Sequence, residues 1–308
     1  MSLAELKKNN LRWVNISEAT KGEIDFLRNN FNFHPLDLED CLVSGQRPKI
    51  EKYEDYIFLV LIFPVYNRET REIEPSEINF FIGHNLIITI HDTKLPPVNE
   101  LYEKCQTDDE DSQRLLSHGS SYLLYEMLDK LLSYCYPMLD HISIDIRTIE
   151  KQIFAGYERK NLSELLITRR NITDFRKIMQ AHKNTLKKLA AVIKDRNFST
   201  SSKIKIYYND LIELSKEIWD HLGGFKEAIE TLQDTNESLI SNRLNDIMKT
   251  FTTMSVVIFV MTLVATLFGI GAPGTPFLNL PWAFWLILML LIVVAMGMWQ
   301  YFKKRKYL

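Results

Sequence analysis

The sequence predicts a mixed α/β domain, then long packed helices, and finally two C-terminal helices that cross a membrane. Three observations support this fold class. Strand and helix patterns alternate over the first hundred residues, and a strict seven-residue apolar repeat follows. No Asp, Glu, Lys or Arg then occurs from Thr250 to Phe302, so all 76 charged residues lie in the other 255 positions.

The composition of the whole chain excludes several classes of protein. With 46% hydrophobic residues and a net charge of −2, the chain is too apolar and too neutral to be largely disordered. It also lacks the overall positive charge of a nucleic-acid binder, so no nucleic-acid partner is expected. Three cysteines provide no disulfide framework. Met1–Asn10 has no apolar core and is not a signal peptide.

The first hundred residues contain the strand signals. Leu11–Ile16 is predicted as a strand, Lys21–Asn30 as a helix, and the dense apolar run Tyr56–Tyr66 as a buried strand. Glu77–Ile82 and Leu86–Ile90 are β-rich runs, and the three residues between them begin with glycine. These two runs are therefore predicted to form a hairpin.

Helical patterns replace the strand patterns farther along the chain. Leu115–Phe154 and Leu162–Asp195 are predicted as helices, and a third begins near Ser201. No proline occurs between Ser201 and Phe268, so this third helix is expected to continue into the first membrane span. Packing within one chain and packing between subunits both explain its seven-residue repeat. The repeat consists of Ile204, Leu211, Ile218, Phe225, Leu232 and Leu239.

The uncharged stretch contains two apolar runs of membrane-spanning length. Phe251–Phe268 has 18 residues and Trp282–Tyr301 has 20, which corresponds to about 27 and 30 Å of helix. Prolines and glycines between the runs exclude one continuous helix. A buried hairpin of a soluble protein is the alternative, but such a hairpin would rarely keep 53 residues without a charge.

Charges beside the two runs predict the membrane topology. Arg243 and Lys249 precede the first span, a basic tail starting at Lys303 follows the second, and the loop between has no charge. The positive-inside rule places both termini in the cytoplasm of a multi-pass protein of the inner or plasma membrane. The predicted segments are a cytosolic α/β domain at 1–110, a cytosolic helical stalk at 111–249, membrane helices at 250–268 and 282–302, an external loop at 269–281 and a basic tail at 303–308.

Catalytic and cofactor motifs are weak. The chain has no His-Glu-x-x-His, no Cys-x-x-Cys and no phosphate-binding loop of the Walker type. Gly269, Gly271 and Gly274 have the spacing of a dinucleotide fingerprint, but they follow a membrane-length helix instead of a strand. The acidic run Asp108–Asp111 is typical of a solvated loop. We therefore expect neither an enzyme nor a resident cofactor.

The first span carries hydroxyl groups along one helical face. Polar residues inside a span usually face a bundle interior or water. Because two spans cannot enclose a pore, a pore requires an oligomer, with Met248 and Phe259 as apolar constrictions that gate by dewetting. Hydroxyls bonded to their own helix backbone, or plain helix packing, are the alternatives. Steps of three and four residues place on this face Asn245, Met248, Thr252, Ser255, Phe259, Thr262 and Thr266.

Several short motifs carry a family resemblance. They are His34–Asp40, Gln46–Tyr53, Glu77–Phe81, Tyr122–Glu126 and Ser241–Lys249, followed by the two spans and the basic tail. In this order and spacing the chain resembles the CorA family of divalent-cation transporters over nearly its whole length.

The resemblance implies a homopentameric funnel embedded in membrane lipid. Each subunit would have a cytosolic α/β/α sandwich, a stalk helix that continues as the pore-lining first span, and an outer second span. Family members carry Mg2+ and often Co2+ or Ni2+, and a related ZntB branch carries Zn2+. The family's pore positions fall here on Asn245, Met248, Phe251, Thr252, Phe259, Thr262 and Thr266.

The chain departs from the family at the outer mouth of the pore. Family members end the first span with Gly-Met-Asn, whose asparagine ring faces a hydrated cation. This chain has Gly269, Ile270 and Gly271 there, so its third position offers only a backbone carbonyl, and the loop offers no carboxylate. Since Mg2+ sheds water reluctantly, a carbonyl ring that binds a hydrated ion is physically allowed.

A second departure concerns a regulatory cation site between neighbouring cytosolic domains. The family uses one Asp from a hairpin and one from the stalk. The stalk position falls on Asp210, but the hairpin position falls near Asn67, so we expect a weaker or rebuilt site. Glu69, Glu72 or Glu213 are candidate substitutes, and an ordinary solvated Asp210 is the alternative.

Three functional hypotheses follow. The leading one is passive transport of hydrated divalent cations, with Mg2+ as the default ion. The second is a ZntB-like Zn2+ transporter coupled to protons. The third is a membrane-anchored divalent-ion sensor or scaffold without transport, which the missing asparagine favours.

Overall fold

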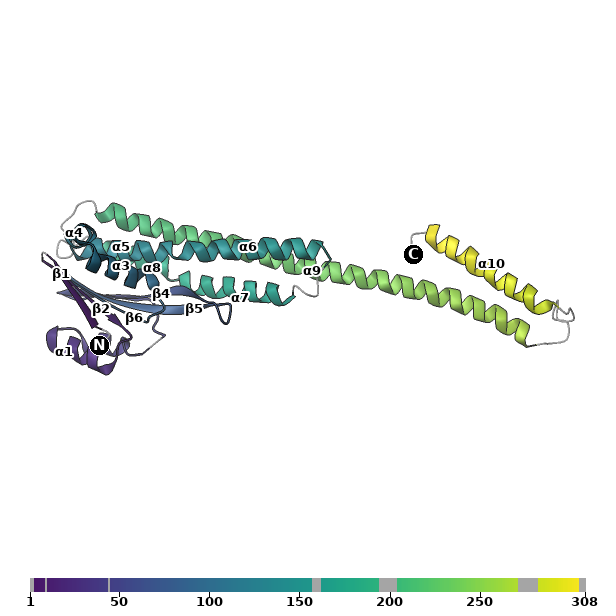
Figure 1. Cartoon of the computed structure of the whole chain (residues 1–308), viewed down its shortest axis with the longest axis horizontal. Helices are drawn as coiled ribbons and strands as arrows, with labels where there is room; N and C mark the ends of the chain where they lie inside the picture. Colours follow the sequence, from purple (N-terminus) through teal and green to yellow (C-terminus); the bar gives the residue numbers. More distant parts are fainter. Residues whose placement is uncertain are drawn as a thin grey trace. The chain divides into compact units, whose positions relative to one another are not determined.

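The computed structural model describes residues 3–8, 10–43, 45–156, 162–193, 204–270 and 282–304. The chain divides into two compact units, Met1–Gln233 and Asp234–Leu308. The first unit contains the strands and most of the helices, and the second contains the long apolar helices (Figure 1). The boundary between the units lies inside a single long helix.

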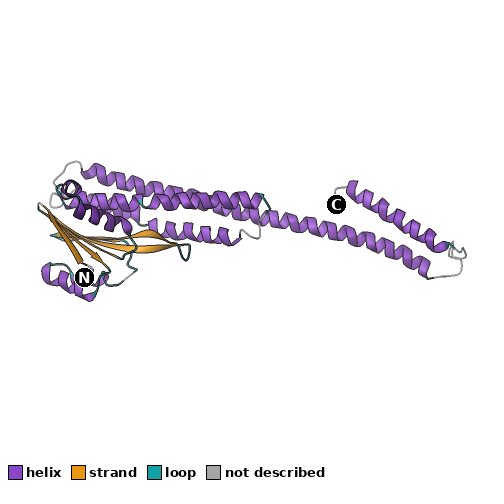
Figure 2. Cartoon of the chain, viewed as in Figure 1, coloured by secondary structure: helices purple, strands orange, loops and turns teal. Residues whose placement is uncertain are grey.

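A six-stranded sheet forms the centre of the first unit (Figure 2). Its strand order is β1-β2-β6-β5-β4-β3. β2 and β6 are parallel, and all other neighbours are antiparallel. The longest pair is a hairpin in which Tyr56 lies opposite Gly83 and Asn67 opposite Glu72. The strands are β1 (Leu3–Lys8), β2 (Leu11–Ser17), β3 (Lys49–Lys52), β4 (Tyr56–Asn67), β5 (Glu72–Gly83) and β6 (Leu86–His91).

Two short helices cover one face of the sheet. They are α1 (Lys21–Asn30) and α2 (Pro35–Asp40). A capping box between Thr20 and Glu23 starts α1, and Pro35 at the first helical position starts α2. Their apolar side chains join those of β2, β4, β5 and β6 in one buried cluster.

The other helices of this unit lie on the opposite side of the sheet from α1, as Figure 1 shows. α5 and α7 pack against β5, and α8 packs against β3. The α/β/α sandwich implied by the family resemblance is therefore confirmed. The helices are α3 (Pro96–Thr107), α4 (Asp109–Leu116), α5 (Ser120–Ser133), α6 (Cys135–Phe154), α7 (Leu162–Met179) and α8 (His182–Ile193).

The helical run predicted from Leu115 to Phe154 is divided into three helices. Helix α4 ends at Leu116, and Gly119, whose φ of 88° is a conformation that favours glycine, is the N-cap of α5. Pro137 lies in the first turn of α6 and cannot donate a helical hydrogen bond, so α5 and α6 separate at Tyr134.

The longest helix, α9 (Ile204–Gly269), has 66 residues and continues without interruption into the apolar segment. Within the first unit its seven-residue repeat is buried at Ile204, Leu211, Ile218 and Leu232. The hydroxyl of Tyr208 donates a 2.8 Å hydrogen bond to the carbonyl of Ser121 on α5. This part of the repeat therefore packs inside one chain.

The second unit contains the end of α9 and α10 (Ala283–Lys304). Of the helices described, these two are long and apolar enough to cross a membrane. Their best windows have mean hydropathies of 2.2 and 2.0 and are almost entirely exposed. High hydropathy without burial is the property expected of helices whose surroundings are lipid.

Candidate functional site

The apolar end of α9 has one face that α10 partly shields. The shielded row on α9 is Thr253, Val257, Val260, Val264 and Phe268, with Met261 beside it, and the row on α10 is Ile287, Leu291, Val294, Met298 and Phe302, with Leu286 and Ala295 beside it. Both rows repeat every three or four residues, as expected where two helices lie side by side. The two rows identify the side of α9 that is turned toward α10.

The face predicted to line a pore lies on the other side of α9. At about 100° of rotation per residue, its mean direction is roughly opposite the shielded row. Every residue of this face is exposed in the chain, and Phe259 is 70% exposed. One chain therefore leaves the whole face uncovered. The face comprises Asn245, Met248, Phe251, Thr252, Ser255, Phe259, Thr262 and Thr266.

Three hydroxyls on this face donate to the backbone of their own helix. Ser255 Oγ donates to the Phe251 carbonyl at 2.9 Å, and Thr262 Oγ1 to the Ile258 carbonyl at 2.8 Å. Thr266 Oγ1 donates to the carbonyl of Thr262 at 2.9 Å. The backbone bonding considered in the sequence analysis is thus present. It uses the hydroxyl hydrogen and leaves the oxygen lone pairs available as acceptors.

The stalk end of this face opens into a hollow of about 620 Å3. Asn245, Met248 and Thr252 line it together with Phe302 of α10. Lys249 also lines the hollow, and its ammonium lies 3.2 Å from Asp246. The nearest charges are therefore paired with each other, and amide, thioether and hydroxyl groups form much of the remaining wall.

The other end of the face is the predicted outer mouth. Gly269 is the last residue of α9, and the Ile270 N–H donates to the Thr266 carbonyl at 3.1 Å. The Ile270 side chain is exposed, and Gly271 lies outside the described residues. A Cβ at Gly269 would meet no atom within 4 Å, so packing in the chain does not require glycine there.

Asn67, at the predicted regulatory position, forms hydrogen bonds within the β4–β5 hairpin. Its Nδ2 donates to Glu74 at 2.6 Å, and its Oδ1 accepts the Glu69 N–H at 2.9 Å. Glu72 forms an ion pair with Arg170. These bonds stabilise the turn and occupy both the amide and one of the candidate substitute carboxylates.

Asp210, the stalk partner in that prediction, is exposed on α9 and lies near Asp129 of α5. Burial, together with the negative charges of Glu126 and Asp210, raises the pKa of Asp129. The fold thus gathers these three acidic residues, whereas no hydrogen bond or ion pair within the described chain joins Asp210 to Asn67. Sequence reasoning missed Asp129 and Glu126, which are three residues apart on a predicted helix. No group of three His, Cys, Asp or Glu in the described residues is arranged to hold a metal ion directly.

Comparison with known proteins gives a match over nearly the whole chain. The profile of a family described as CorA-like Mg2+ transporter protein matches residues 8–304. The cobalt/magnesium transport protein CorA of Thermotoga maritima is 24% identical over 96% of this chain and 83% of its own length. The CorA protein of Methanocaldococcus jannaschii, with the same description, is 23% identical over 93% and 88%.

Solved structures show the same fold. The complete CorA magnesium transporter from Methanocaldococcus jannaschii superposes with a TM-score of 0.83, covering 98% of this chain and 93% of that one at 20% identity. The full-length CmaX protein gives 0.75, covering 96% and 88% at 20% identity. The ZntB cytoplasmic domain from Vibrio parahaemolyticus gives 0.59, covering 77% and 90% at 12% identity.

Proposed function

Since the chain belongs to the family of CorA-like Mg2+ transporters, a family of divalent-cation transporters and not of enzymes, we propose that it forms a homopentameric pore for hydrated divalent cations. Mg2+ is the default ion, with Co2+ and Ni2+ as further candidates. The observation that carries this proposal is the uncovered face of α9. This face has regularly spaced oxygen acceptors and no partner in the chain, so it could line a pore around the symmetry axis of several copies.

The pore in this proposal is lined by neutral groups. Hydroxyl oxygens of Ser255, Thr262 and Thr266 would accept hydrogen bonds from the water shell of an ion. Mg2+ keeps most of its water when it binds, so acceptors for that water suit it better than direct ligands. Met248 and Phe259 would form apolar rings that close the path when they lose water.

Orientation and regulation complete the proposal. Both termini lie in the cytoplasm, and Gly269, Ile270 and Gly271 form the outer mouth, where backbone carbonyls face the hydrated ion. Asp210 and Asp129 bind a cytosolic divalent cation, because a cation would offset the burial and the carboxylate repulsion that together raise the pKa of Asp129. The neighbouring subunit would supply the remaining oxygen ligands.

The test is ion flux into proteoliposomes that contain the purified full chain. Under a gradient or an applied potential, Mg2+, Co2+ or Ni2+ is expected to enter, and flux of none of the divalent ions would refute transport. A dependence of Zn2+ flux on a pH gradient would instead indicate a proton-coupled Zn2+ transporter. Altered stability with divalent ions and no flux would indicate a sensor or scaffold.

Two matched threonine variants test the pore face itself. Thr262 and Thr253 both donate to the carbonyl four residues earlier, at 2.8 Å each, but they lie on opposite faces of α9. Thr262→Val is expected to reduce flux, whereas Thr253→Val should preserve it in assembled protein. Equal flux in the two variants would place the path elsewhere.

A further inference from the structure

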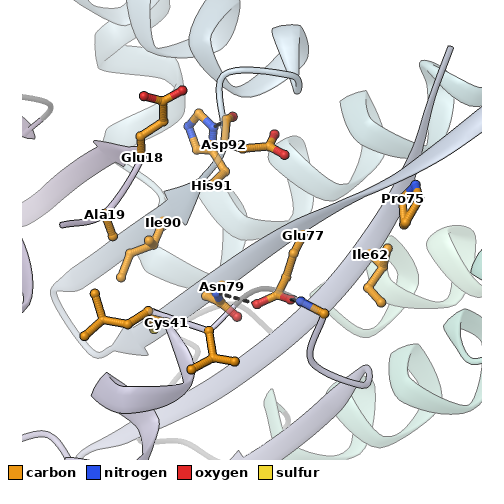
Figure 3. A pocket seen from close by; sticks show the side chains of 13 residues that line it. Glu18, Ala19, Cys41, Ile62, Pro75, Glu77, Asn79, Ile90, His91 and Asp92 are labelled. Atoms are coloured by element: carbon orange, nitrogen blue, oxygen red, sulfur yellow. Dashed lines mark hydrogen bonds between the residues drawn. The ribbon is translucent and has the colours of Figure 1, made fainter. Parts of the chain in front are cut away.

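A cavity of about 450 Å3 lies wholly in the first unit, on the sheet face that α1 and α2 cover (Figure 3). Apolar side chains form much of its wall, among them Leu42, Val43, Ile62 and Ile90. The remaining wall contains carboxylates and one amide. The transport path proposed above uses none of these residues.

Three carboxylates line this cavity from three neighbouring strands. Glu77 lies on β5, Asp92 directly follows β6, and Glu18 directly follows β2. The register places these positions at one level, since His91 pairs with both Ile78 and Ser17. Like charges at one level of adjacent strands destabilise a sheet unless a positive charge compensates them.

The chain compensates these carboxylates with neutral donors. Glu77 Oε2 accepts the N–H groups of Gly45 and Gln46 at 3.0 and 2.9 Å. Asp92 Oδ1 accepts the hydroxyl of Ser76 at 2.5 Å and the N–H of Lys94 at 3.0 Å. Within the described ranges none of the three carboxylates forms a salt bridge. Burial lowers the pKa of His91, so this neighbouring ring adds no positive charge at neutral pH.

The amide of Asn79 provides a second, independent sign of a missing donor. Asn79 lines the cavity and is only 4% exposed. Its Nδ2 donates to Glu77 Oε1 at 3.0 Å, as the dashed line in Figure 3 marks. Its Oδ1 is buried and has no hydrogen-bond partner among the described residues. An unpaired buried acceptor is costly, so a ligand that brings an N–H donor would satisfy it.

The separation of the three carboxylates along the cavity favours an extended organic cation over a single metal ion. Nowhere in the described chain are three acidic, His or Cys side chains arranged to hold a metal ion directly. The carboxylates are instead distributed along a cavity with apolar walls. A ligand with ammonium groups joined by methylene segments matches both features, because its charges meet carboxylates while its carbon atoms contact Leu42, Val43 and Ile90.

We propose that this cavity binds a linear aliphatic polyamine. One ammonium group donates to Asn79 Oδ1 and Glu77, and another lies at Asp92 and Glu18. The inference goes beyond transport and does not depend on it, since binding is measured without ion flux.

The experiment is isothermal titration calorimetry of the purified full chain in detergent with spermidine. Asp92→Asn is expected to weaken binding about tenfold, the usual effect of losing a charge-assisted hydrogen bond. Asp92→Asn keeps an Oδ1 acceptor for the Ser76 hydroxyl and the Lys94 N–H. Glu77→Gln is avoided because both oxygens of that carboxylate accept hydrogen bonds, so an amide nitrogen there would face a donor.

A matched pair of arginine variants controls for fold and net charge. Val43 lines the cavity and is 59% exposed, whereas Leu36 is 62% exposed and lies outside its lining. Val43→Arg places a guanidinium at the cavity and should abolish spermidine binding. Leu36→Arg adds the same charge outside it and should preserve binding.

Other outcomes overturn the proposal. The absence of saturable spermidine binding at low ionic strength contradicts it directly. Equal weakening by both arginine variants indicates long-range charge attraction instead of a site. Saturable Mg2+ binding that Val43→Arg removes, in the absence of spermidine binding, assigns the cavity to a hydrated metal ion.

Discussion

The hydroxyl of Tyr56 donates a 2.8 Å hydrogen bond to the carboxylate of Asp37, which is only 1% exposed. The Tyr53 hydroxyl lies 3.2 Å from the same carboxylate and 3.0 Å from that of Glu51, and its ring stacks on that of Tyr56 at 4.4 Å between centroids. Burial raises the pKa of Asp37. The motifs around Asp37 and Tyr53, which carry the family resemblance, thus meet in one cluster that joins α2 to the sheet.

Removing the Tyr56 hydroxyl tests that cluster. Tyr56→Phe should destabilise the first unit by about 1–3 kcal/mol, because a buried carboxylate loses a donor that it cannot replace with water. Thermal unfolding followed by intrinsic tryptophan fluorescence measures the change, since Trp13 is fully buried. Tyr102→Phe is the control, because that hydroxyl has no described hydrogen-bond partner. Equal stability of the Tyr56 variant and wild type would contradict the argument.

Two adjacent glycines in α9 should respond differently to the same substitution. A Cβ at Gly224 would meet nothing within 4 Å, so Gly224→Ala should stabilise the helix by about 0.5–1 kcal/mol. A Cβ at Gly223 would lie 3.3 Å from Nη1 of Arg176, whose guanidinium lies 4.4 Å from the Trp219 ring centroid. Gly223→Ala should therefore give a lower unfolding temperature than Gly224→Ala, and the reverse order would refute this reasoning.

His182 makes the first unit sensitive to acid. The ring is completely buried against Phe63, and burial lowers its pKa to about 4 from the ordinary 6.5. Below pH 6.5 the unfolded chain binds a proton that the folded chain does not bind. Folding stability from this group is therefore lost as pH falls from about 6.5 to 4, by about 3 kcal/mol in all.

Substitution with a ring that cannot titrate checks that prediction. His182→Phe should flatten the dependence of the unfolding temperature on pH between 6.5 and 4. His118→Phe, which changes an exposed histidine, should retain the wild-type dependence. Parallel pH profiles for wild type and His182→Phe would show that other groups cause the acid sensitivity.

The apolar ring proposed at Phe259 predicts a leak. Phe259→Ala should widen the narrowest part of the path and raise the ion conductance of proteoliposomes in the closed condition. Phe284 on α10 is equally exposed, at 70%, so Phe284→Ala is the matched control and should leave conductance unchanged. If both variants assemble and neither leaks, Phe259 does not line the path.

The outer mouth can be tested by restoring an amide. Gly271→Asn would present a ring of amide oxygens where this chain has backbone carbonyls, and it should raise Mg2+ flux or change the order of preferred ions. Ion competition in the proteoliposome assay measures this change. Identical selectivity before and after the substitution would show that the mouth does not determine ion choice.

Elements whose conformation depends on residues close in sequence could be predicted, whereas elements that depend on tertiary pairing could not. The helix Lys21–Asn30 matched because Thr20 and Glu23 cap it within four residues. Strand β1 was missed, since Leu3–Lys8 has no β-branched residue and its extended state depends on pairing with β2, with Leu3 opposite Ile16.

In the candidate site, too, local periodicity was predictable and tertiary proximity was not. The face that contains Thr262 was predictable, because residues three and four apart share a helix face whatever surrounds them. Asp129 beside Asp210 was not predictable in this way, because α5 and α9 are distant in sequence and meet only through tertiary packing. The exposed position of Phe259 could be predicted, whereas the residues that would surround it in the proposed pore belong to other copies of the chain.

The hydroxyls of Ser255, Thr262 and Thr266, whose hydrogens bond to their own helix, have a consequence for charge discrimination. In the proposed pore, such a wall attracts the hydrogens of adjacent water and turns the water oxygens toward the axis. An ion on the axis then meets the negative ends of the water dipoles. Cations are stabilised and anions such as chloride are disfavoured, so the lining rejects one sign of charge without carrying any charge itself.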